Sequence, residues 1–355
     1  MKTISIFGLL CTLILTMAIF YACGRPKTAV THDSATFDSD GTAHITRVLP
    51  VPSSVSPEAQ KWLASLTQQS DSPETLEVRR KSLDEWRKQG SAEARRLYPA
   101  SVEETNIAGV RTDIITPLDT PQANRGRVLI NLHGGGFNGD SGSLIEGVPI
   151  CNLAKIKVVS VYYRLAPENP FPAAVEDVVA VYKELLKSYK PQNIGIFGTS
   201  AGATLTAQVT AQLKHSGIPL PGALGMFSTH PDYSQVTDSQ QLFGLNGLPG
   251  ATGPSDPNRP PDDPYVGNTN RKDPVLSPLF SDLKNWPPSL LVTSTRDLLL
   301  SDTVMFHLAL LRERNDAQLV VFEALPHAFW YHFQLPETKE ALEIMARFFD
   351  DKLGR

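Results

Sequence analysis

From about residue 127 onward, short apolar runs alternate with longer segments in which apolar residues recur at helical spacing. The apolar runs cover residues 128–132, 158–163, 193–197, 223–227, 289–295 and 318–322, and the helical segments cover 173–187, 201–215, 302–314 and 337–353. Runs that are apolar throughout are typical of parallel strands buried on both faces. The pattern predicts an α/β fold with a doubly wound, mostly parallel sheet, and ligands are expected at the carboxyl ends of its strands.

Upstream of this region the apolar spacing is that of two amphipathic helices followed by strands. Ser56 and Pro57 start the first helix, because serine caps a helix and proline fits its first turn. A second helix is expected over residues 72–89, and residues 102–115 alternate enough to form one or two strands that turn at Gly109. We therefore expect a helical cap over residues 56–100 and a larger α/β domain over residues 101–355, in which the Gly- and Pro-rich stretch 241–270 forms a long loop.

The N-terminus has one lysine followed by an apolar run that ends at Ala22 and Cys23. This order is typical of a secretory signal, and a small residue before Cys23 resembles a bacterial lipoprotein processing site, although Phe20 and Tyr21 depart from it. A run of about 19 apolar residues could also remain as an uncleaved membrane anchor. We expect residues 1–23 to be a leader or an anchor of an exported, periplasmic or membrane-anchored protein, with Cys23 as the candidate for lipidation. Residues 24–55 are polar with little periodicity and are expected to form a flexible arm.

The composition argues against several classes of function. With 355 residues, of which 41% are hydrophobic, the chain can form one large α/β domain or two small ones. Its net charge of -4 gives no electrostatic case for binding nucleic acid. Three cysteines make neither a disulfide framework nor a zinc site, and Cys151 is expected to be a small core residue. The sequence has no metal, nucleotide or flavin signal, so we expect no cofactor.

A Gly-Thr-Ser-Ala-Gly pattern at residues 198–202 lies where an apolar run ends and a helix begins. A serine in such a turn holds its hydroxyl in the open at the edge of the sheet, and the flanking glycines avoid clashes with the neighbouring strand and helix. The setting predicts that Ser200 is a nucleophile. Such a serine needs a base within hydrogen-bond reach and an acid that orients the base.

Three histidines follow Ser200 late in the chain. His327 comes just after the last apolar run, in the loop where the base is expected on a sheet of this kind. His307 lies among apolar residues of a helical segment, and His332 is the rival five residues beyond His327. We expect His327 to be the base.

The acid should also lie in a loop after a strand. Asp297 follows the run 289–295 and is our candidate. Asp302 fits better as a cap or an early residue of the next helix, and Asp232, after the run 223–227, is the main competitor. We expect Asp297 to orient His327.

A glycine-rich stretch, His133-Gly134-Gly135-Gly136, directly follows the run 128–132. Without Cβ atoms, glycines let a substrate carbonyl approach and let backbone amides point toward it. We expect the amides of Gly135 and Gly136, with that of Ala201 at a helix N-terminus, to form an oxyanion hole supported by His133 and Gly134.

Together these segments resemble the hormone-sensitive lipase family, the bacterial carboxylesterases among the α/β-hydrolases. The resemblance spans residues 55–353 and rests on 133–137, 163–168, 171–173, 198–202, Asp297 and His327. It implies an α/β-hydrolase fold with an N-terminal helical cap, and a serine esterase for short- to medium-chain acyl esters or lactones. The family more often has Asp in place of Thr199, which places this chain in a Gly-Thr-Ser-Ala-Gly subgroup, and it usually has Pro in place of Leu298.

The sequence thus predicts a carboxylesterase that acts on a small-molecule ester through an acyl-enzyme on Ser200, with Asp297 and His327 completing the catalytic triad. An amidase or peptidase would use the same triad. A non-catalytic ligand-binding homologue would be expected to lose the serine, the histidine or the glycine loop, and none is lost. We expect the segment of Arg164 and Glu168 to be a structural brace through ion pairing. We expect no nucleic-acid partner, and contact with a membrane would come through the N-terminal lipid or helix; the sequence gives no prediction of the oligomeric state.

Overall fold

A computed structural model describes residues 33–66, 75–244 and 263–354, and the chain divides into two units, one up to Pro50 and one from Val51 onward. In the first unit, β1 (Ser34–Phe37) pairs antiparallel with β2 (Ala43–Thr46). This hairpin corrects the expectation of an arm without regular structure, because Asp40 and Gly41 supply a turn: the Thr42 amide donates to Asp40 Oδ1 at 2.9 Å, and Gly41 has a φ of 89°.

The predicted leader and the candidate lipidation residue Cys23 lie outside the described residues. Within the ranges that are described, no helix is long and apolar enough to span a membrane. Export and anchoring therefore stay predictions from the sequence.

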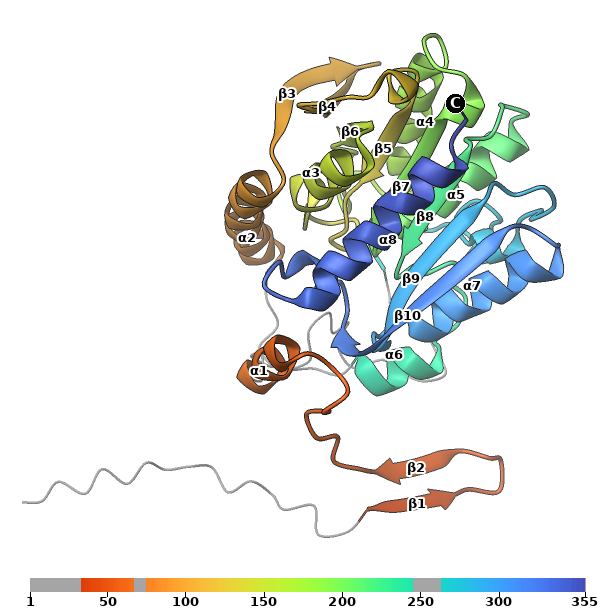
Figure 1. The fold of residues 1–355 in the computed structure, drawn as a ribbon. Helices are drawn as coiled ribbons and strands as arrows, with labels where there is room; N and C mark the ends of the chain where they lie inside the picture. Colours follow the sequence, from red (N-terminus) through yellow and green to blue (C-terminus); the bar gives the residue numbers. More distant parts are fainter. Residues whose placement is uncertain (1–32, 67–74, 245–262, 355) are drawn as a thin grey trace, which may run out of the picture. The chain divides into compact units, whose positions relative to one another are not determined.

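The second unit is built around an eight-stranded sheet with the order β10-β9-β8-β7-β5-β6-β4-β3 (Figure 1). Its strands are β3 (Ala100–Ile107), β4 (Val110–Pro117), β5 (Val128–Leu132), β6 (Lys157–Val161), β7 (Ile194–Thr199), β8 (Ala223–Phe227), β9 (Ser289–Arg296) and β10 (Ala317–Pro326). The β3–β4 and β4–β6 pairs are antiparallel, and the other pairs are parallel. The predicted mostly parallel sheet is confirmed. Because β7 lies between β5 and β8, the loops that follow these three strands meet at one edge of the sheet.

Helices cover both faces of this sheet, which is why the central strands β5, β7 and β8 are buried along their whole length. The helices are α1 (Pro57–Ser65), α2 (Leu76–Leu97), α3 (Ser143–Ala154), α4 (Ala173–Leu185), α5 (Ala201–His215), α6 (Asp238–Phe243), α7 (Leu300–Arg312) and α8 (Pro336–Lys352). Ile130 and Ile196 belong to the core shared with α4, α5 and α7, whereas Leu129 and Phe197 belong to the core shared with α3 and α8. In Figure 1, α8 (blue) crosses one face of the sheet beside α3.

The first cap helix starts where the sequence predicts, whereas the second starts at Leu76, with Thr75 and not Ser72 as its N-cap, and also ends later than predicted. Ser56 caps α1, because its hydroxyl accepts a hydrogen bond from the Ala59 amide at 3.0 Å. The second helix, α2, was expected to stop at Gln89 but continues to Leu97. Gly90 does not end it, because this glycine packs against α3: a Cβ at Gly90 would lie 2.5 Å from Ile145 Cδ1.

Two helices, α3 and α6, had no counterpart among the predicted elements. Almost every residue of α3 is buried, so its sequence has no polar face from which a helical period could be recognised. The short α6 is held by a capping box between Thr237 and Gln240 and enters the stretch predicted as a long loop. In the described end of that stretch, Tyr265 is buried and stacks on Phe137 at 3.5 Å.

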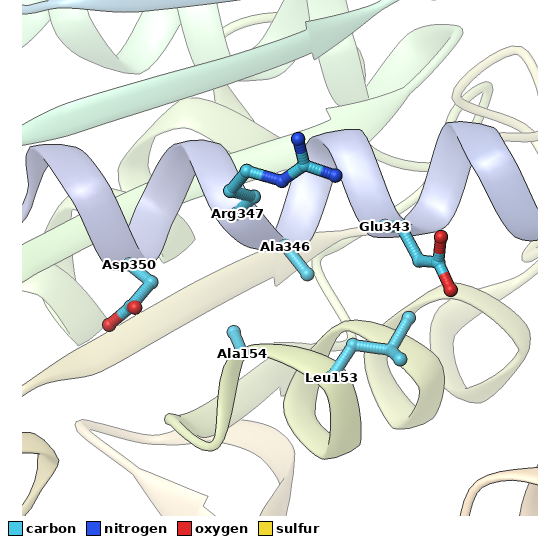
Figure 2. A pocket seen from close by; sticks show the side chains of 6 residues that line it. All are labelled: Leu153, Ala154, Glu343, Ala346, Arg347 and Asp350. Atoms are coloured by element: carbon cyan, nitrogen blue, oxygen red, sulfur yellow. The ribbon is translucent and has the colours of Figure 1, made fainter.

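A hollow of about 270 Å³ lies between α3 and α8 (Figure 2). It is lined by Leu153, Ala154, Glu343, Ala346, Arg347 and Asp350. None of the residues singled out by the sequence lines it, so it plays no part in the site described next.

Candidate active site

Ser200 occupies the sharp turn between β7 and α5. Its backbone has φ 59° and ψ −119°, a conformation that a residue with a side chain rarely adopts, and its amide donates to the Phe227 carbonyl at 2.8 Å. The turn fits because its neighbours are glycines: a Cβ at Gly198 would lie 2.2 Å from the Leu132 carbonyl oxygen, and one at Gly202 would lie 1.8 Å from it. The sequence therefore needs glycine on both sides of Ser200.

The glycine-rich loop after β5 lies directly against this turn. A Cβ at Gly134 would lie 3.4 Å from Ser200 Cβ and 2.9 Å from the Thr199 carbonyl oxygen. Gly135 and Gly136 have φ values of 113° and 64°, which favour glycine. In the part of the chain that the structure describes, the amides of Gly135, Gly136 and Ala201 donate to no other protein group. The glycine loop and the start of α5 thus leave three amide donors near Ser200 that make no hydrogen bond within the described residues.

His133 holds the start of this loop from inside the protein. Its ring is buried, stacks on Tyr163 at 4.1 Å and donates through Nδ1 to the Gly134 carbonyl at 2.8 Å. The Tyr163 hydroxyl donates to the His133 carbonyl at 2.6 Å. His133 therefore supports the loop and is not exposed to a substrate.

Cap helix α2 contacts the far end of the same loop through Arg80. The guanidinium donates to the Asn138 carbonyl at 2.7 Å, to the Ala166 carbonyl at 3.0 Å and to both oxygens of Glu168 at 2.7 Å. The hydrogen bond from Arg80 lowers the pKa of Glu168 to about 2. Glu168 thus joins the cap to the loop, whereas Arg164 pairs with Asp177 at 2.9 Å in a separate contact.

The loops after β9 and β10 bring His327 and Asp297 together. His327 Nδ1 lies 2.8 Å from Asp297 Oδ1, and the carboxylate also accepts from the Leu299 amide at 2.9 Å, from Thr293 Oγ1 at 3.1 Å and from Ser228 Oγ. The structure records no hydrogen bond between Ser200 Oγ and His327, both of which it describes. Contacts of this kind are often long without substrate and tighten when it binds.

The environment of Asp297 keeps it ionised. Full burial by itself would raise the pKa of this carboxyl, but the charge of a protonated His327 and the hydrogen bonds from His327, Ser228 and the Leu299 amide outweigh burial, and the pKa falls below its usual value. An ionised Asp297 requires a proton on His327 Nδ1, which leaves Nε2 of the neutral ring as a base. The pair is therefore suited to accept a proton from a nearby hydroxyl.

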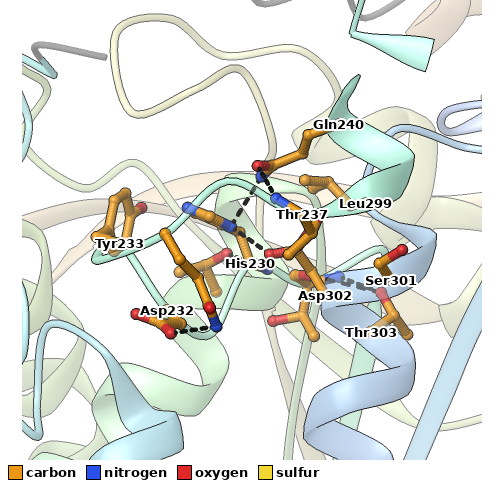
Figure 3. Close-up of polar contacts among 12 residues, drawn as sticks. His230, Asp232, Tyr233, Thr237, Gln240, Leu299, Ser301, Asp302 and Thr303 are labelled. Atoms are coloured by element: carbon orange, nitrogen blue, oxygen red, sulfur yellow. Dashed lines mark hydrogen bonds and ion pairs between the residues drawn. The ribbon is translucent and has the colours of Figure 1, made fainter. Parts of the chain in front are cut away.

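A second histidine–aspartate pair lies at the same edge of the sheet (Figure 3). His230 Nδ1, after β8, lies 2.7 Å from Asp302 Oδ1 in the first turn of α7, and Asp302 Oδ2 accepts from Thr237 Oγ1 at 2.7 Å. Burial would lower the pKa of His230, but the charge of Asp302 and its hydrogen bond raise it above its usual value. The His230 amide donates to Thr204 Oγ1 at 3.0 Å, so this pair is tied to α5 one turn beyond Ser200.

The remaining candidates from the sequence have local partners. Asp232 accepts from the Ser234 amide at 2.8 Å and the Gln235 side chain at 2.7 Å, which closes its own turn. His307 belongs to α7, and its Nε2 lies 3.3 Å from the carbonyl oxygen of Ala317 at the start of β10. The His332 ring packs against Trp62 in a tilted arrangement, with the ring centroids 4.4 Å apart, and burial lowers the pKa of His332 to about 4.

With this geometry in place, comparison with known proteins places the fold. A sequence profile of the α/β-hydrolase fold matches residues 129–331, more than half of the chain. The chain belongs to this family. It is 31% identical over 241 residues to an acetyl-hydrolase of Streptomyces hygroscopicus, covering 66% of this chain and 79% of that protein. It is 29% identical over 272 residues to an esterase of Acinetobacter venetianus, covering 71% and 84%.

Solved structures give the same result. The crystal structure of an esterase E25 has a TM-score of 0.75 and 31% identity, covering 87% of this chain and 98% of that one. An esterase from the bacterial hormone-sensitive lipase family has a TM-score of 0.67 and 28% identity, covering 80% and 94%. The predicted resemblance to bacterial esterases of this α/β-hydrolase family is confirmed, whereas membership of a Gly-Thr-Ser-Ala-Gly subgroup stays a prediction.

Several residues that shape the site had no signal in the sequence. Ser228, Glu146 and His230 contact residues 69, 53 and 72 positions away, respectively. Nothing in their local patterns distinguishes them from other polar residues in loops or helices. Only the positions of Ser228 and His230 just after β8 could have marked these two, by the same reasoning that singled out Asp232.

Proposed function

We propose that this α/β-hydrolase is a serine carboxylic-ester hydrolase in which Ser200 is the nucleophile, His327 the general base and Asp297 the acid that orients it. The observation that carries the proposal is the strained turn of Ser200, packed against a glycine loop in which the amides of Gly135 and Gly136 have no partner among the described residues. A strained residue persists where the surrounding structure holds it for function. Comparison with proteins named esterase and acetyl-hydrolase supports an ester as the substrate.

The first half of the reaction forms the acyl-enzyme. His327 Nε2 takes the proton of Ser200 Oγ as this oxygen bonds to the ester carbonyl carbon. The carbonyl oxygen becomes an oxyanion, and the amides of Gly135, Gly136 and Ala201 donate to it. Ala201 is the first residue of α5, so the positive end of the helix dipole adds to this stabilisation. The carbon–oxygen bond to the alcohol then breaks, and His327 gives its proton to the leaving oxygen.

The second half releases the acid. A water molecule gives its proton to His327 Nε2 while its oxygen attacks the acyl carbon, and the same amides hold the second oxyanion. The bond between the acyl carbon and Ser200 Oγ breaks, and the proton on His327 returns to Ser200. Asp297 stays ionised throughout and stabilises the charged imidazolium in each half. We propose acyl esters or lactones of short to medium chain length as substrates.

Hydrolysis of p-nitrophenyl esters from acetate to dodecanoate tests this assignment. We expect Ser200→Ala and His327→Gln each to lower kcat by at least about 10³-fold, because neither the nucleophile nor the base can be replaced by the oxyanion hole alone. His230→Gln is the matched control, since it alters the other histidine–aspartate pair of the same edge, and its kcat should stay within about tenfold of the wild type. Equal activity of Ser200→Ala and wild type contradicts the mechanism, and a loss in His230→Gln as large as in His327→Gln overturns the choice of base. Parallel rates on p-nitroanilides separate an esterase from an amidase.

We also propose that residues 1–23 direct export and that Cys23 is lipidated or the leader is kept as an anchor. The proposal rests on the apolar run and the Ala22-Cys23 pair of the sequence. Mass spectrometry of the protein from its native host tests it: a lipid-modified N-terminal Cys23, or a full-length chain confined to the membrane fraction, supports anchoring. An intact Met1 in the soluble fraction contradicts it.

A further inference from the structure

One buried hydroxyl, that of Thr199, joins the segments that carry the proposed catalytic groups. Thr199 ends β7 and directly precedes Ser200. Its Oγ1 accepts a hydrogen bond from Trp330 Nε1 at 2.9 Å, and Trp330 lies three residues beyond His327. On its other side the hydroxyl contacts Glu146 of α3, the helix that follows the glycine loop.

The hydrogen-bond roles in this contact are largely determined by chemistry. An indole N–H can only donate, so the Thr199 oxygen must accept from Trp330. The Thr199 proton is then free to point at Glu146 Oε1, while Glu146 Oε2 accepts from Asn131 Nδ2 at 3.0 Å. Asn131 belongs to β5, whose end leads into the glycine loop, and its own oxygen accepts from Ser160 Oγ at 3.0 Å. The polar chain therefore connects the end of β7 with the segment after His327, with α3 and with the two strands β5 and β6.

Glu146 is an unusual residue to find in this position. It is fully buried, and it forms no ion pair with any cationic side chain of the described residues. Burial raises the pKa of Glu146 to about 8, although the hydrogen bonds with Thr199 and Asn131 act to lower it. The carboxyl is therefore mostly neutral at pH 7. The neighbouring Tyr331 hydroxyl is buried and makes no hydrogen bond within the described residues.

A carboxyl buried without a cation costs stability compared with an amide or an apolar side chain of similar size. Departures of this kind from good packing are expected at functional sites. The functional element beside Glu146 is the serine turn. Two hydrogen bonds hold the Ser200 backbone in its strained conformation: the Ser200 amide donates to the Phe227 carbonyl, and the Thr204 amide donates to the Ser200 carbonyl. The Thr199 side chain is an additional anchor, on the strand side of the turn.

We infer that Glu146 is a positioning residue for the nucleophile: through the Thr199 hydroxyl it fixes the serine turn relative to the His327 loop and to the glycine loop. The inference rests on the proposed role of Ser200. Because the contact lies beneath the turn, its loss should misplace Ser200 Oγ without altering the surface that binds substrate. A displacement of about 1 Å in a catalytic group can lower a rate by about 100-fold.

The deciding variant is Thr199→Val, which keeps the shape of the side chain and removes its hydroxyl. We expect kcat on p-nitrophenyl acetate to fall by about tenfold or more, with KM within about twofold of the wild type. Glu146→Met should show the same split. Glu146→Gln should recover kcat to within about threefold, because its amide can donate to Thr199 and its oxygen can accept from Asn131. In the double variant Thr199→Val/Glu146→Met the losses should not add, since both changes break one contact.

The matched control is Thr210→Val. Thr210 is also fully buried, lies further along α5 and donates to the Thr206 carbonyl at 2.8 Å. Its kcat should equal that of the wild type. Wild-type kcat in Thr199→Val, a loss in Thr210→Val of the same size, or additive losses in the double variant would each overturn the inference. An inactive wild type would instead count against the proposed esterase, so the two failures are distinguishable.

Discussion

Replacing Glu146 by glutamine should stabilise the protein at neutral pH and change its stability little near pH 5. In the folded protein burial raises the pKa of Glu146 to about 8, whereas in the unfolded chain the ordinary value of 4.5 applies. Between these values the folded state holds one proton more than the unfolded state, so the free energy of unfolding falls as the pH rises. The contribution is fully present below pH 4.5 and is lost by about pH 8.

The size of the effect follows from the width of this window. One pKa unit corresponds to about 1.4 kcal/mol, so ionisation of the unfolded chain costs about 3 kcal/mol of stability by pH 7. Glutamine cannot ionise, and it keeps the contacts to Thr199 and Asn131. The titratable side chain beside Glu146 is Tyr331, whose pKa burial raises well above its usual value, so it stays neutral throughout the window.

Urea unfolding of both proteins at pH 5, 6, 7 and 8 measures this directly. The difference in the free energy of unfolding, Glu146→Gln minus wild type, should rise by about 1.4 kcal/mol per pH unit and level off above pH 8. Taking the difference cancels the titration of all other groups, and a constant cost of the amide shifts the difference equally at every pH without changing its slope. Glu340→Gln, at an exposed position of α8, should show no such slope. A difference that is independent of pH would mean that Glu146 is ionised in the folded protein, and the reasoning would be wrong.

Three further changes test other parts of the site. Ser228→Ala removes a hydrogen-bond donor from the Asp297 carboxylate, so the pKa of that carboxyl should rise. We expect kcat/KM on p-nitrophenyl acetate to fall by about tenfold. An unchanged kcat/KM would show that the remaining donors suffice. Gly135→Ala should lower kcat by about 100-fold or more, because residue 135 has a φ of 113° and its Cβ would lie 2.2 Å from the Gly139 carbonyl oxygen. The control is Gly217→Ala, which is also at positive φ but has nothing within 4 Å of the new Cβ. It should lower only the melting temperature and leave kcat unchanged. Arg80→Gln breaks the hydrogen bond of Arg80 with the Asn138 carbonyl, so kcat should fall severalfold with little change in melting temperature. A kcat equal to that of the wild type would show that the cap does not position the loop.

The parts of the site that the sequence could predict are those fixed by neighbours along the chain. The glycine loop and the serine turn each follow an apolar run directly, and a residue that follows a parallel strand must lie at the carboxyl edge of the sheet. The same argument ranks Asp297 above Asp302, which lies in the first turn of α7. It does not reveal the second pair, His230 with Asp302, although His230 also follows a strand of this sheet.

The parts that the sequence could not predict depend on contacts between distant segments. Almost all of α3 is buried, so it gives no helical period, and neither the helix nor the buried Glu146 could be read from the pattern. The helix α2 continues past its predicted end at residue 89, and Gly90 lies within it in contact with Ile145 of α3. In each case a tertiary contact decided what the local signal could not.

Thr199 brings these two kinds of information together. Its place in the motif is visible in the sequence, but the consequence of replacing it by aspartate depends on Glu146. With threonine, the serine turn is anchored by a hydroxyl that accepts from Trp330 and contacts a single buried carboxyl. With aspartate, two carboxyls would face each other in the same buried space, and like charges at that distance share one proton. The junction beneath the nucleophile would then carry a net negative charge at neutral pH, so residue 199 sets the charge of the anchor as well as its geometry.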